Sequence, residues 1–354
     1  MNRDCLPRFE AAFAGAEPIS DFQEALVSWF QRVGRDDPWR RTRDPYAILV
    51  SEIMLQQTRV ETVLRGRFYE RWMERFPHWA ALAEAPEAEV LKAWEGLGYY
   101  RRARFLQAAA REVIEHWGGV LPREAVAIRS LPGVGDYTAG AILSFAFGIA
   151  APLVDGNVIR VFARIFACEA PVDLPATKSA MWSWARLLLP DDRMSRDYNA
   201  ALMELGQRIC TRANPLCHEC PVEGFCLARQ RGTEKELPKK IAAIPVTILE
   251  ESVALLRRGS EVLIVPETGS RRRGLWKLPD LPPEFARELT PRGASTYAIT
   301  RYRVRLQVFE VAGLSVAEPD RWPESWQGGS WISLEHPREW PTLGAPYLKV
   351  LKSL

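Results

Sequence analysis

The hydrophobic pattern of the chain changes its period once, and this change limits the fold more than any other feature. From residue 21 to about 228, apolar residues recur three and four positions apart, with repeated helix start and stop signals. Beyond a charged stretch with two prolines the pattern alternates, which is typical of strands. The sequence therefore predicts an N-terminal extension at 1–20, a mainly α domain at 21–228, a linker at 229–245 and a smaller α+β domain at 246–354.

The composition agrees with two globular domains. Of the 354 residues, 47% are hydrophobic and 26% are charged, which excludes a disordered chain. The net charge of +3 is too small to decide whether the partner is a polyanion. Charges scattered through residues 3–10 argue against a secretory signal, and the uncharged stretch 137–154 holds glycines and a proline, which indicates a buried helix with a loop. We expect a cytoplasmic protein with no membrane partner.

Helix signals place two sharp corners in the first part of the chain. An aspartate-proline pair predicts the start of a helix at 45–55, and a capping box at 58–61 predicts that another helix begins at once. Gln56 and Gln57 would then occupy the corner between them. Tyr99 is expected at a second corner, ahead of a helix that ends at paired glycines.

The alternating part predicts strands with one charged face. Residues 252–256 and 261–265 indicate a hairpin, and residues 297–311 indicate one long strand. Three arginines of that strand share a face opposite its apolar residues: Arg301, Arg303 and Arg305. They would either meet phosphates or form an ordinary charged solvent face.

Four of the six cysteines fall within 17 residues, in the pattern Cys210-x6-Cys217-x2-Cys220-x5-Cys226. Four thiolates at this spacing can hold one metal or cluster, whereas disulfides do not suit a reducing compartment. Zinc sites usually pair two short C-x2-C knuckles, and this pattern contains one. Metal ligation is favoured over four incidental buried thiols, with zinc as the competing occupant.

A glycine turn at Leu131-Pro-Gly133-Val-Gly135 leads into an apolar helix. Glycines ahead of a helix N-terminus expose backbone N–H groups, which can hold a phosphate. An ordinary turn between helices is the alternative.

Two carboxylates have environments suited to acid and base chemistry. Glu52 lies among apolar residues of the helix at 45–55, so its pKa should rise and it could act as a general acid. Asp155 immediately precedes an apolar helix, whose dipole favours the ionised form. The alternatives are a salt-bridged Glu52 and an Asp155 that only caps a helix.

Several further motifs accompany these features. They are Pro38-Trp-Arg40, Ser51-Glu-Ile-Met-Leu-Gln-Gln-Thr58, Glu95-Gly-Leu-Gly-Tyr-Tyr100, Val154-Asp-Gly-Asn157 and Ala201-Leu-Met-Glu-Leu-Gly206. Together with the glycine turn and the cysteines, they resemble the adenine DNA glycosylases of the MutY type, within the helix-hairpin-helix superfamily that includes endonuclease III. The resemblance covers residues 21–228.

The resemblance implies a base excision repair enzyme that flips adenine out of double-stranded DNA, where it is mispaired with 8-oxoguanine or guanine, and hydrolyses its glycosidic bond. The expected enzyme is a monomer that associates with the nucleoid through DNA and contains a 4Fe-4S cluster. The implied catalytic residues are Glu52, Asp155, Tyr137 and Asn157. The implied base- and DNA-contacting residues are Trp39, Arg40, Leu55, Gln56, Gln57, Tyr99, Leu131, Gly133, Gly135, Glu204, Thr300 and Arg301. The implied cluster ligands are Cys210, Cys217, Cys220 and Cys226.

Tyr137 distinguishes two reactions within the superfamily. Bifunctional relatives carry a lysine at the matching place, which forms a Schiff base and leads to strand cleavage. A tyrosine there predicts a monofunctional glycosylase that leaves an abasic site. A bifunctional glycosylase and a non-catalytic iron-sulfur DNA-binding protein are the alternatives.

The second domain resembles the nudix-like lesion-recognition domain of the same family. Residues 274–279 resemble the stretch that precedes a nudix box, but no glutamate-rich box follows. The family has Phe-Ser-His where this chain has Ile299-Thr300-Arg301. Thr300 keeps a hydroxyl that could contact the oxidised guanine, while the arginine leaves the strength of the 8-oxoguanine preference open.

Overall fold

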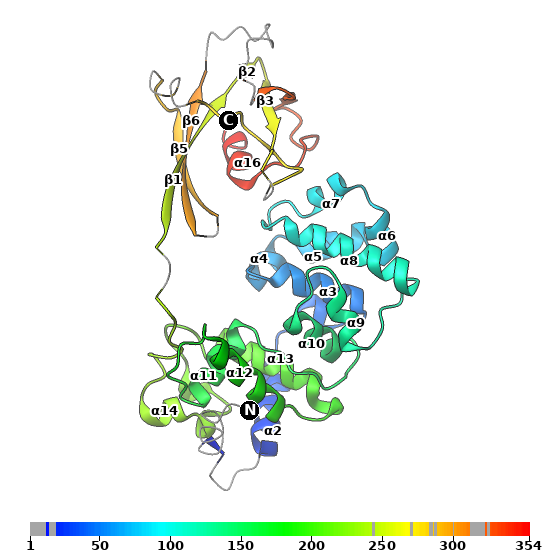
Figure 1. The fold of residues 1–354 in the computed structure, drawn as a ribbon, viewed down its shortest axis with the longest axis vertical. Coiled ribbons are helices and arrows are strands. Elements are labelled where there is room, and N and C mark those ends of the chain that lie inside the picture. Colours follow the sequence, from blue (N-terminus) through cyan, green and yellow to red (C-terminus); the bar gives the residue numbers. More distant parts are fainter. Residues whose placement is uncertain are drawn as a thin grey trace. The chain divides into compact units, whose positions relative to one another are not determined.

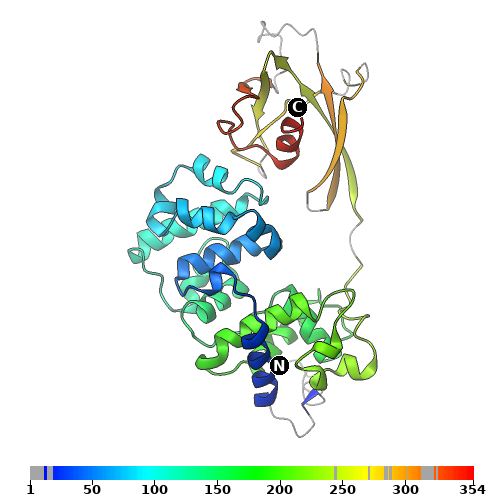
Figure 2. The same cartoon turned by 180° about the vertical axis from the view of Figure 1, so that it is seen from behind.

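The computed structural model describes residues 12–13, 19–242, 245–269, 272–282, 286, 289–299, 301–311, 323 and 326–354. The chain forms two compact units (Figures 1 and 2). One comprises Met1–Glu84 and Phe105–Ala243, and the other comprises Ala85–Arg104 and Ile244–Leu354. No helix in the described part of the chain is long and apolar enough to cross a membrane.

The first unit is entirely helical in its described residues. Its helices are α2 (Ile19–Val33), η1 (Pro38–Arg40), α3 (Pro45–Leu55), α4 (Val60–Arg65), α5 (Phe68–Arg75), α6 (Trp79–Glu84), α9 (Ala125–Ser130), α10 (Asp136–Phe145), α11 (Gly156–Ile165), α12 (Pro175–Leu187), α13 (Asp192–Arg208), η2 (Cys217–Glu219), η3 (Glu223–Phe225) and α14 (Leu227–Arg231). The helix α8 (Arg101–Trp117) begins in the second unit and ends in the first. The predicted mainly α character of this part is confirmed.

Helices α2, α11, α12 and α13 gather around one core, seen in blue and green in Figure 1. Aromatic side chains fill this core, and the rings of Phe166 and Trp184 stack with centroids 4.1 Å apart. Val222 and Phe225, from the cysteine-rich segment, are buried in the same core. Burial of such large side chains stabilises each by roughly 1.5–3 kcal/mol, so the cysteine-rich segment is part of the folded unit.

Helix α3 begins and ends where the sequence predicts. The Asp44 carboxylate accepts a hydrogen bond from the Tyr46 N–H at 3.0 Å, which caps the helix. Gln57 adopts a left-handed backbone conformation with φ of 58°, and this turns the chain sharply at the predicted corner. The predicted capping box at 58–61 is wrong. Thr58 is still part of that turn, and the extended residue before α4 is Arg59, whose side chain does not cap the helix.

The glycine turn between α9 and α10 depends on one glycine for its shape. Gly133 has φ of 80°, and a Cβ at this position would lie 2.7 Å from the Phe105 Cβ. Gly135 differs, because a Cβ there would meet open space. Gly133 therefore fixes the turn, while Gly135 leaves the start of α10 open to an approaching group.

In its described residues, the second unit combines two small sheets with helices. Its elements are α7 (Glu87–Ala93), β1 (Thr247–Leu255), β2 (Arg257–Arg258), β3 (Glu261–Pro266), β4 (Trp276–Lys277), β5 (Gly293–Ile299), β6 (Tyr302–Glu310), β7 (Ser330–Ser333) and α16 (Ala345–Leu351). One sheet has the order β1-β6-β5, in which β1 and β6 are parallel. In the other, β3 pairs with β2, β4 and β7, all antiparallel. The predicted α+β character of the second part is confirmed.

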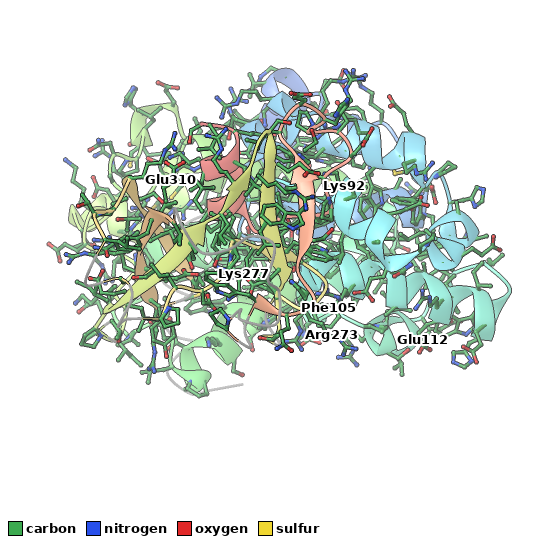
Figure 3. All side chains as sticks on the ribbon, turned by 90° about the horizontal axis from the view of Figure 1, so that it is seen from above. Lys92, Phe105, Glu112, Arg273, Lys277 and Glu310 are labelled. Atoms are coloured by element: carbon green, nitrogen blue, oxygen red, sulfur yellow. The ribbon has the colours of Figure 1, made fainter. Side chains whose placement is uncertain are left out.

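Both faces of β3 are buried, so the second unit has two cores. Val262 and Ile264 pack with Trp340 and Tyr347 in one core, while Leu263 packs with Trp326 in the other. At the end of β4, the Lys277 ammonium, labelled in Figure 3, donates to both carboxylate oxygens of Asp280 at 2.6 Å. Successive residues of a strand point to opposite faces, which explains why an uninterrupted apolar run supplies two cores.

Two details of the predicted strands are wrong. The long strand at 297–311 is a hairpin of β5 and β6, in which Ile299 pairs with Tyr302. The alternation of apolar residues continues on both sides of this reversal, so the pattern conceals the turn. The hairpin predicted at 252–256 and 261–265 is shorter in the structure. Strand β1 pairs with β6, and only the segment that follows β1 pairs with β3.

We expect Gly133→Ala to lower the free energy of unfolding by about 1–3 kcal/mol, because alanine disfavours positive φ and its Cβ meets Phe105. Chemical denaturation of the full chain measures this change. Gly135→Ala is the matched control and should leave stability within about 0.5 kcal/mol. Equal effects of the two substitutions would contradict this account of the turn.

Candidate active site

The centre of the site is a hydrogen bond between two helices that pack together. Glu52 lies in α3 and Tyr137 in the first turn of α10. The Tyr137 hydroxyl donates to the Glu52 carboxylate at 2.7 Å. Glu52 is only 5% exposed, although a carboxylate rarely stays buried without several partners. A carboxyl group held in this way is a candidate for proton transfer.

Burial raises the pKa of Glu52 to about 7. The Tyr137 hydroxyl opposes this rise, the negative charge of Asp155 adds to it, and the Arg40 guanidinium opposes it. Burial also raises the pKa of the Tyr137 phenol, so this group stays protonated and acts as a donor. The predicted rise in the Glu52 pKa is confirmed, and near neutral pH this carboxyl can hold a proton and give it away.

Asp155 caps the N-terminus of α11. Its carboxylate accepts from the Val158 N–H at 2.7 Å and from the Asn157 amide at 2.8 Å. The expectation that the helix terminus would dominate its ionisation is wrong, because burial raises the pKa of Asp155 in spite of these donors and of Arg160. Asp155 therefore lies in a region of low polarity, where an anion interacts strongly with nearby positive charge.

Two arginines extend from the same helix to the cysteine-rich segment. Arg160 donates to the Asn157 side-chain oxygen at 2.9 Å and to the Cys210 carbonyl at 2.7 Å. Arg164 is 1% exposed and donates to the Cys210 Sγ at 3.2 Å and to the Thr211 carbonyl at 2.7 Å. Helix α11 thus carries Asp155 at one end and holds the start of the cysteine-rich segment along its side.

A cavity of about 110 Å³ opens beside Glu52 in the first unit. Trp39, Arg40 and Leu55, which the sequence assigns to base contacts, all line it. A wider cleft of about 810 Å³ adjoins the other side of the site. It is lined by Glu52, Gln56, Gln57, Tyr137, Asp155 and Asn157, among others. Leu55 lines the cleft as well, so the structure brings seven predicted residues to it, and Glu52 borders both the cleft and the cavity.

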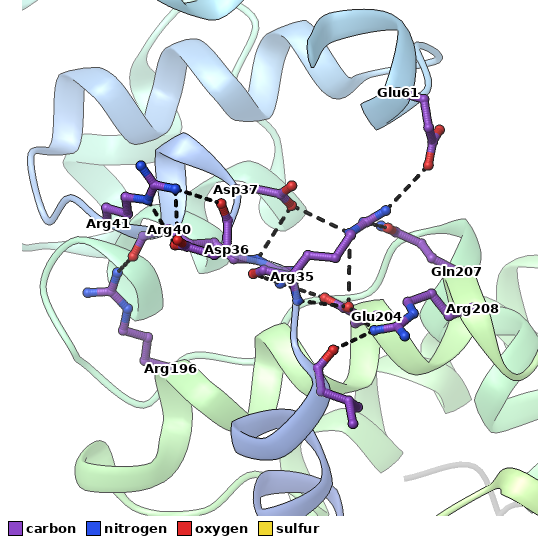
Figure 4. Close-up of polar contacts among 11 residues, drawn as sticks. Arg35, Asp36, Asp37, Arg40, Arg41, Glu61, Arg196, Glu204, Gln207 and Arg208 are labelled. Atoms are coloured by element: carbon purple, nitrogen blue, oxygen red, sulfur yellow. Dashed lines mark hydrogen bonds and ion pairs between the residues drawn. The ribbon is translucent and has the colours of Figure 1, made fainter. Parts of the chain in front are cut away.

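Glu204 occupies a different position from the cavity-lining residues. It is fully buried and does not line the cavity. Figure 4 shows how its carboxylate is held: Arg40 donates to one oxygen at 2.5 Å, and Arg208 donates to the other at 2.8 Å. The Arg35 N–H adds a bond at 3.1 Å. Burial favours the neutral form, yet the bonds from Arg208 and Arg40 prevail and lower the pKa of Glu204, so it stays ionised.

Comparison with known proteins places this site in a family. Residues 50–186 match the HhH-GPD superfamily of base excision DNA repair proteins. The chain is 36% identical over 266 residues to an adenine DNA glycosylase of Mycolicibacterium smegmatis, an alignment that covers 71% of the chain and 88% of that relative. The chain belongs to the adenine DNA glycosylase (MutY) family. Human adenine DNA glycosylase is 45% identical over 234 residues, which cover 64% of the chain and 42% of the human protein.

The chain spans about half the length, or less, of the human and rat adenine DNA glycosylases that it matches. Among solved structures, a thermostable thymine-DNA glycosylase is similar, with a TM-score of 0.54 and 32% identity, over 60% of this chain and 97% of that one. The fold of the adenine DNA glycosylase family thus also occurs in a protein named for another base. The fold alone therefore does not determine which base is removed.

The remaining predicted contacts belong to other parts of the chain. Leu131 is buried, and Gly133 and Gly135 form the turn before α10. Tyr99 is 54% exposed, has φ of 49° and belongs to the second unit. Arg301 lies exposed between β5 and β6, where its guanidinium donates to the Tyr302 hydroxyl at 3.0 Å. Thr300 falls outside the described residues.

The four clustered cysteines line one small cavity together with Arg164 and Arg229. In the described part of the chain, no three His, Cys, Asp or Glu side chains lie close enough together to hold a single metal ion. A 4Fe-4S cluster needs a wider arrangement, because each of its thiolates binds a different iron. Four cysteine thiols around one cavity are a donor set that fits such a cluster.

Sequence reasoning missed most of the polar groups that support the site. Arg160 and Arg164 are charged residues one turn apart in an otherwise apolar helix, and this interruption is a signal that could have identified them. Arg35 and Arg208 hold Glu204 from distant parts of the chain, and no local pattern indicates that contact. Asp37, which lines the cavity, was also missed.

We expect Glu52→Gln to stabilise the protein increasingly as pH rises. The folded-state pKa of Glu52 is about 7, above the ordinary 4.5, so the wild type loses stability as pH rises between these values, whereas glutamine does not ionise. The gain should reach about 3 kcal/mol at pH 8 and vanish near pH 4. Urea unfolding at several pH values measures it, with the exposed Glu24→Gln as control. A gain that is independent of pH would disprove the assignment.

Proposed function

We propose that this protein is a monofunctional adenine DNA glycosylase of base excision repair. Its substrate would be double-stranded DNA with adenine opposite 8-oxoguanine or guanine, bound by a monomer, and its product an abasic site. The observation that carries the proposal is the Glu52–Tyr137 hydrogen bond beside both Asp155 and a cavity. Family membership supports the same conclusion.

Glu52 is the general acid of the proposed reaction. Its raised pKa allows it to carry a proton at neutral pH and transfer it to a ring nitrogen of the flipped adenine. The bond between the sugar C1′ and the base then breaks, and its electron pair leaves with adenine. Tyr137 holds the carboxyl group in place through its hydroxyl. The acid is buried between the base cavity and the cleft, which agrees with this role.

Asp155 stabilises the positive charge that develops on the sugar, and it can form a transient covalent bond with C1′ before water attacks. Asn157 and the helix N–H groups fix the orientation of its carboxylate. Water then attacks C1′, the bond between C1′ and Asp155 breaks and its electron pair returns to the Asp155 carboxylate. The water gives its proton to the Glu52 carboxylate, so the acid is restored. An anion of this kind acts strongly because the site is poorly hydrated.

The remaining residues would position the DNA. Gln56 and Gln57 line the cleft at a sharp corner and would occupy the helix beside the flipped base. The backbone N–H groups after Gly135 would bind a phosphate, because a Cβ at that position meets open space. Leu131, Gly133, Tyr99, Thr300 and Arg301 retain the base- and DNA-contacting roles that the family resemblance implies. Glu204, which does not line the cavity, would act through Arg40, which it holds there.

We also propose that Cys210, Cys217, Cys220 and Cys226 bind a 4Fe-4S cluster. When bound, the cluster would hold the segment around it in one conformation for contact with DNA. Arg164 supports this assignment, because it donates to the Cys210 Sγ and would stabilise a thiolate there. The adjacent Arg160 joins the same segment to Asn157.

We expect Glu52→Gln and Asp155→Asn each to reduce adenine release at least about 1,000-fold, because each removes a group needed in the transition state. The measurement is single-turnover release from duplexes with adenine opposite 8-oxoguanine, guanine or thymine, with and without alkali. With the wild type, the strands of the first two duplexes should be cleaved only when alkali is added, and borohydride should trap no complex between protein and DNA. Absence of release by wild-type protein, or strand cleavage without alkali, would overturn the proposal.

We expect the purified protein to show a broad visible absorption band and to contain iron and inorganic sulfide. Cys217→Ser should lose the band and the iron. Cys168→Ser is the matched control, because Cys168 is buried in the helical core and does not line the cavity of the four cysteines, and it should keep both. Stoichiometric zinc without the band would show that the site holds a different metal.

A further inference from the structure

The cavity beside Glu52 contains a carboxylate that the proposed reaction does not use. Asp37 lies directly before η1, lines the cavity and is only 4% exposed. Its carboxylate faces the Nε atoms of Arg35 and Arg40 at 3.7 and 3.8 Å, beyond hydrogen-bond distance. Among the described residues, no donor forms a hydrogen bond with this carboxylate. Two ion pairs without a hydrogen bond leave the carboxylate oxygens of Asp37 able to accept one.

The other carboxylate and amide oxygens near the cavity already take part in hydrogen bonds. Both oxygens of Glu204 are held by arginines, and Glu204 does not line the cavity. The Gln207 side-chain oxygen accepts from Arg35, and the Asp197 carboxylate accepts from Gln31 at 3.1 Å. Asp197 is also the more exposed of the two aspartates that line the cavity. Asp37 is therefore the acceptor most available to a bound base.

The two flanking arginines influence the ionisation of Asp37. Burial raises the pKa of Asp37 above its ordinary value, while Arg35 and Arg40 oppose that rise. Neither guanidinium forms a hydrogen bond with the Asp37 carboxylate. Arg35 donates instead to Gln207, and Arg40 donates to Glu204. The two arginines thus limit the rise in the pKa of Asp37 without forming a hydrogen bond to its carboxylate, which lines the cavity.

We propose that Asp37 is a specificity-determining residue whose carboxylate accepts a hydrogen bond from the exocyclic amino group of the flipped purine. This inference rests on the proposed glycosylase function and extends it to the choice of base. A carboxylate only accepts hydrogen bonds, so it pairs with a 6-amino group and opposes a 6-oxo group. Rejection is strong in a buried site, because a 6-oxo purine would leave two acceptors facing each other without water.

The test removes the acceptor from the protein and the donor from the substrate. Single-turnover release is measured for adenine, for purine without the amino group and for hypoxanthine, each opposite 8-oxoguanine. Asp37→Leu should slow adenine release about 10- to 100-fold relative to the wild type and leave purine release nearly unchanged. In Asp37→Asn the new amide can donate a hydrogen bond. This substitution should lower the ratio of the adenine release rate to the hypoxanthine release rate at least about 10-fold.

Asp36→Leu is the matched control, because this neighbouring aspartate is exposed and pairs with the exposed Arg41 at 2.7 Å. It should leave all three rates unchanged. Equal slowing of adenine and purine release by Asp37→Leu would overturn the proposal, since a structural role affects both bases alike. Unchanged adenine release would also overturn it.

A binding measurement separates this inference from the proposed catalysis. Duplexes that carry 2′-fluoro-2′-deoxyadenosine, or the matching purine nucleoside, resist hydrolysis and report affinity alone. Asp37→Leu should weaken binding of the adenine duplex about tenfold relative to the wild type and leave binding of the purine duplex unchanged. An equal loss of affinity for the two duplexes, or no loss for either, would overturn the inference. Wild-type protein that binds both duplexes but releases no adenine would refute the glycosylase function, and the binding ratio would still decide the role of Asp37.

Discussion

The buried hydrogen bond between Tyr137 and Glu52 is the contact on which the site depends. It joins α3 to α10, and it keeps a carboxyl group in surroundings that raise its pKa to about 7. The same burial lowers stability at neutral pH, because the folded protein binds the Glu52 proton more tightly than the unfolded chain does. The helix corner at Gln57 and the turn at Gly133 hold the two helices in the positions that this contact requires.

Helix α11 organises the other half of the site. Its N-terminus holds Asp155, and its buried side presents Arg160 and Arg164 to the cysteine-rich segment. A charged side chain inside an apolar helix is unfavourable unless its donors are satisfied, and here backbone carbonyls satisfy them. The position of Asp155 and the course of the cysteine-rich segment therefore depend on the same helix.

The helices around the site were predictable from the sequence because their signals are local. Asp44 caps α3 as expected, and Asp155, which the sequence places directly before an apolar helix, caps α11. The hairpin between β5 and β6 was not predictable, since its apolar alternation continues through the reversal. The network around Glu204 was missed for a different reason: Arg35 is far from it in sequence, and only folding brings them together.

The sequence by itself determined the class of the two parts, the family and the residue types of the site, because periodicity, helix caps and motif spacing are properties of neighbouring residues. Only the tertiary structure decided which carboxylates are buried and which have partners. Burial sets the pKa of Glu52 and reverses the expected shift for Asp155. Packing also separates Glu204 from the cavity and leaves Asp37 facing it. These outcomes depend on desolvation and on distant donors, which a linear pattern does not contain.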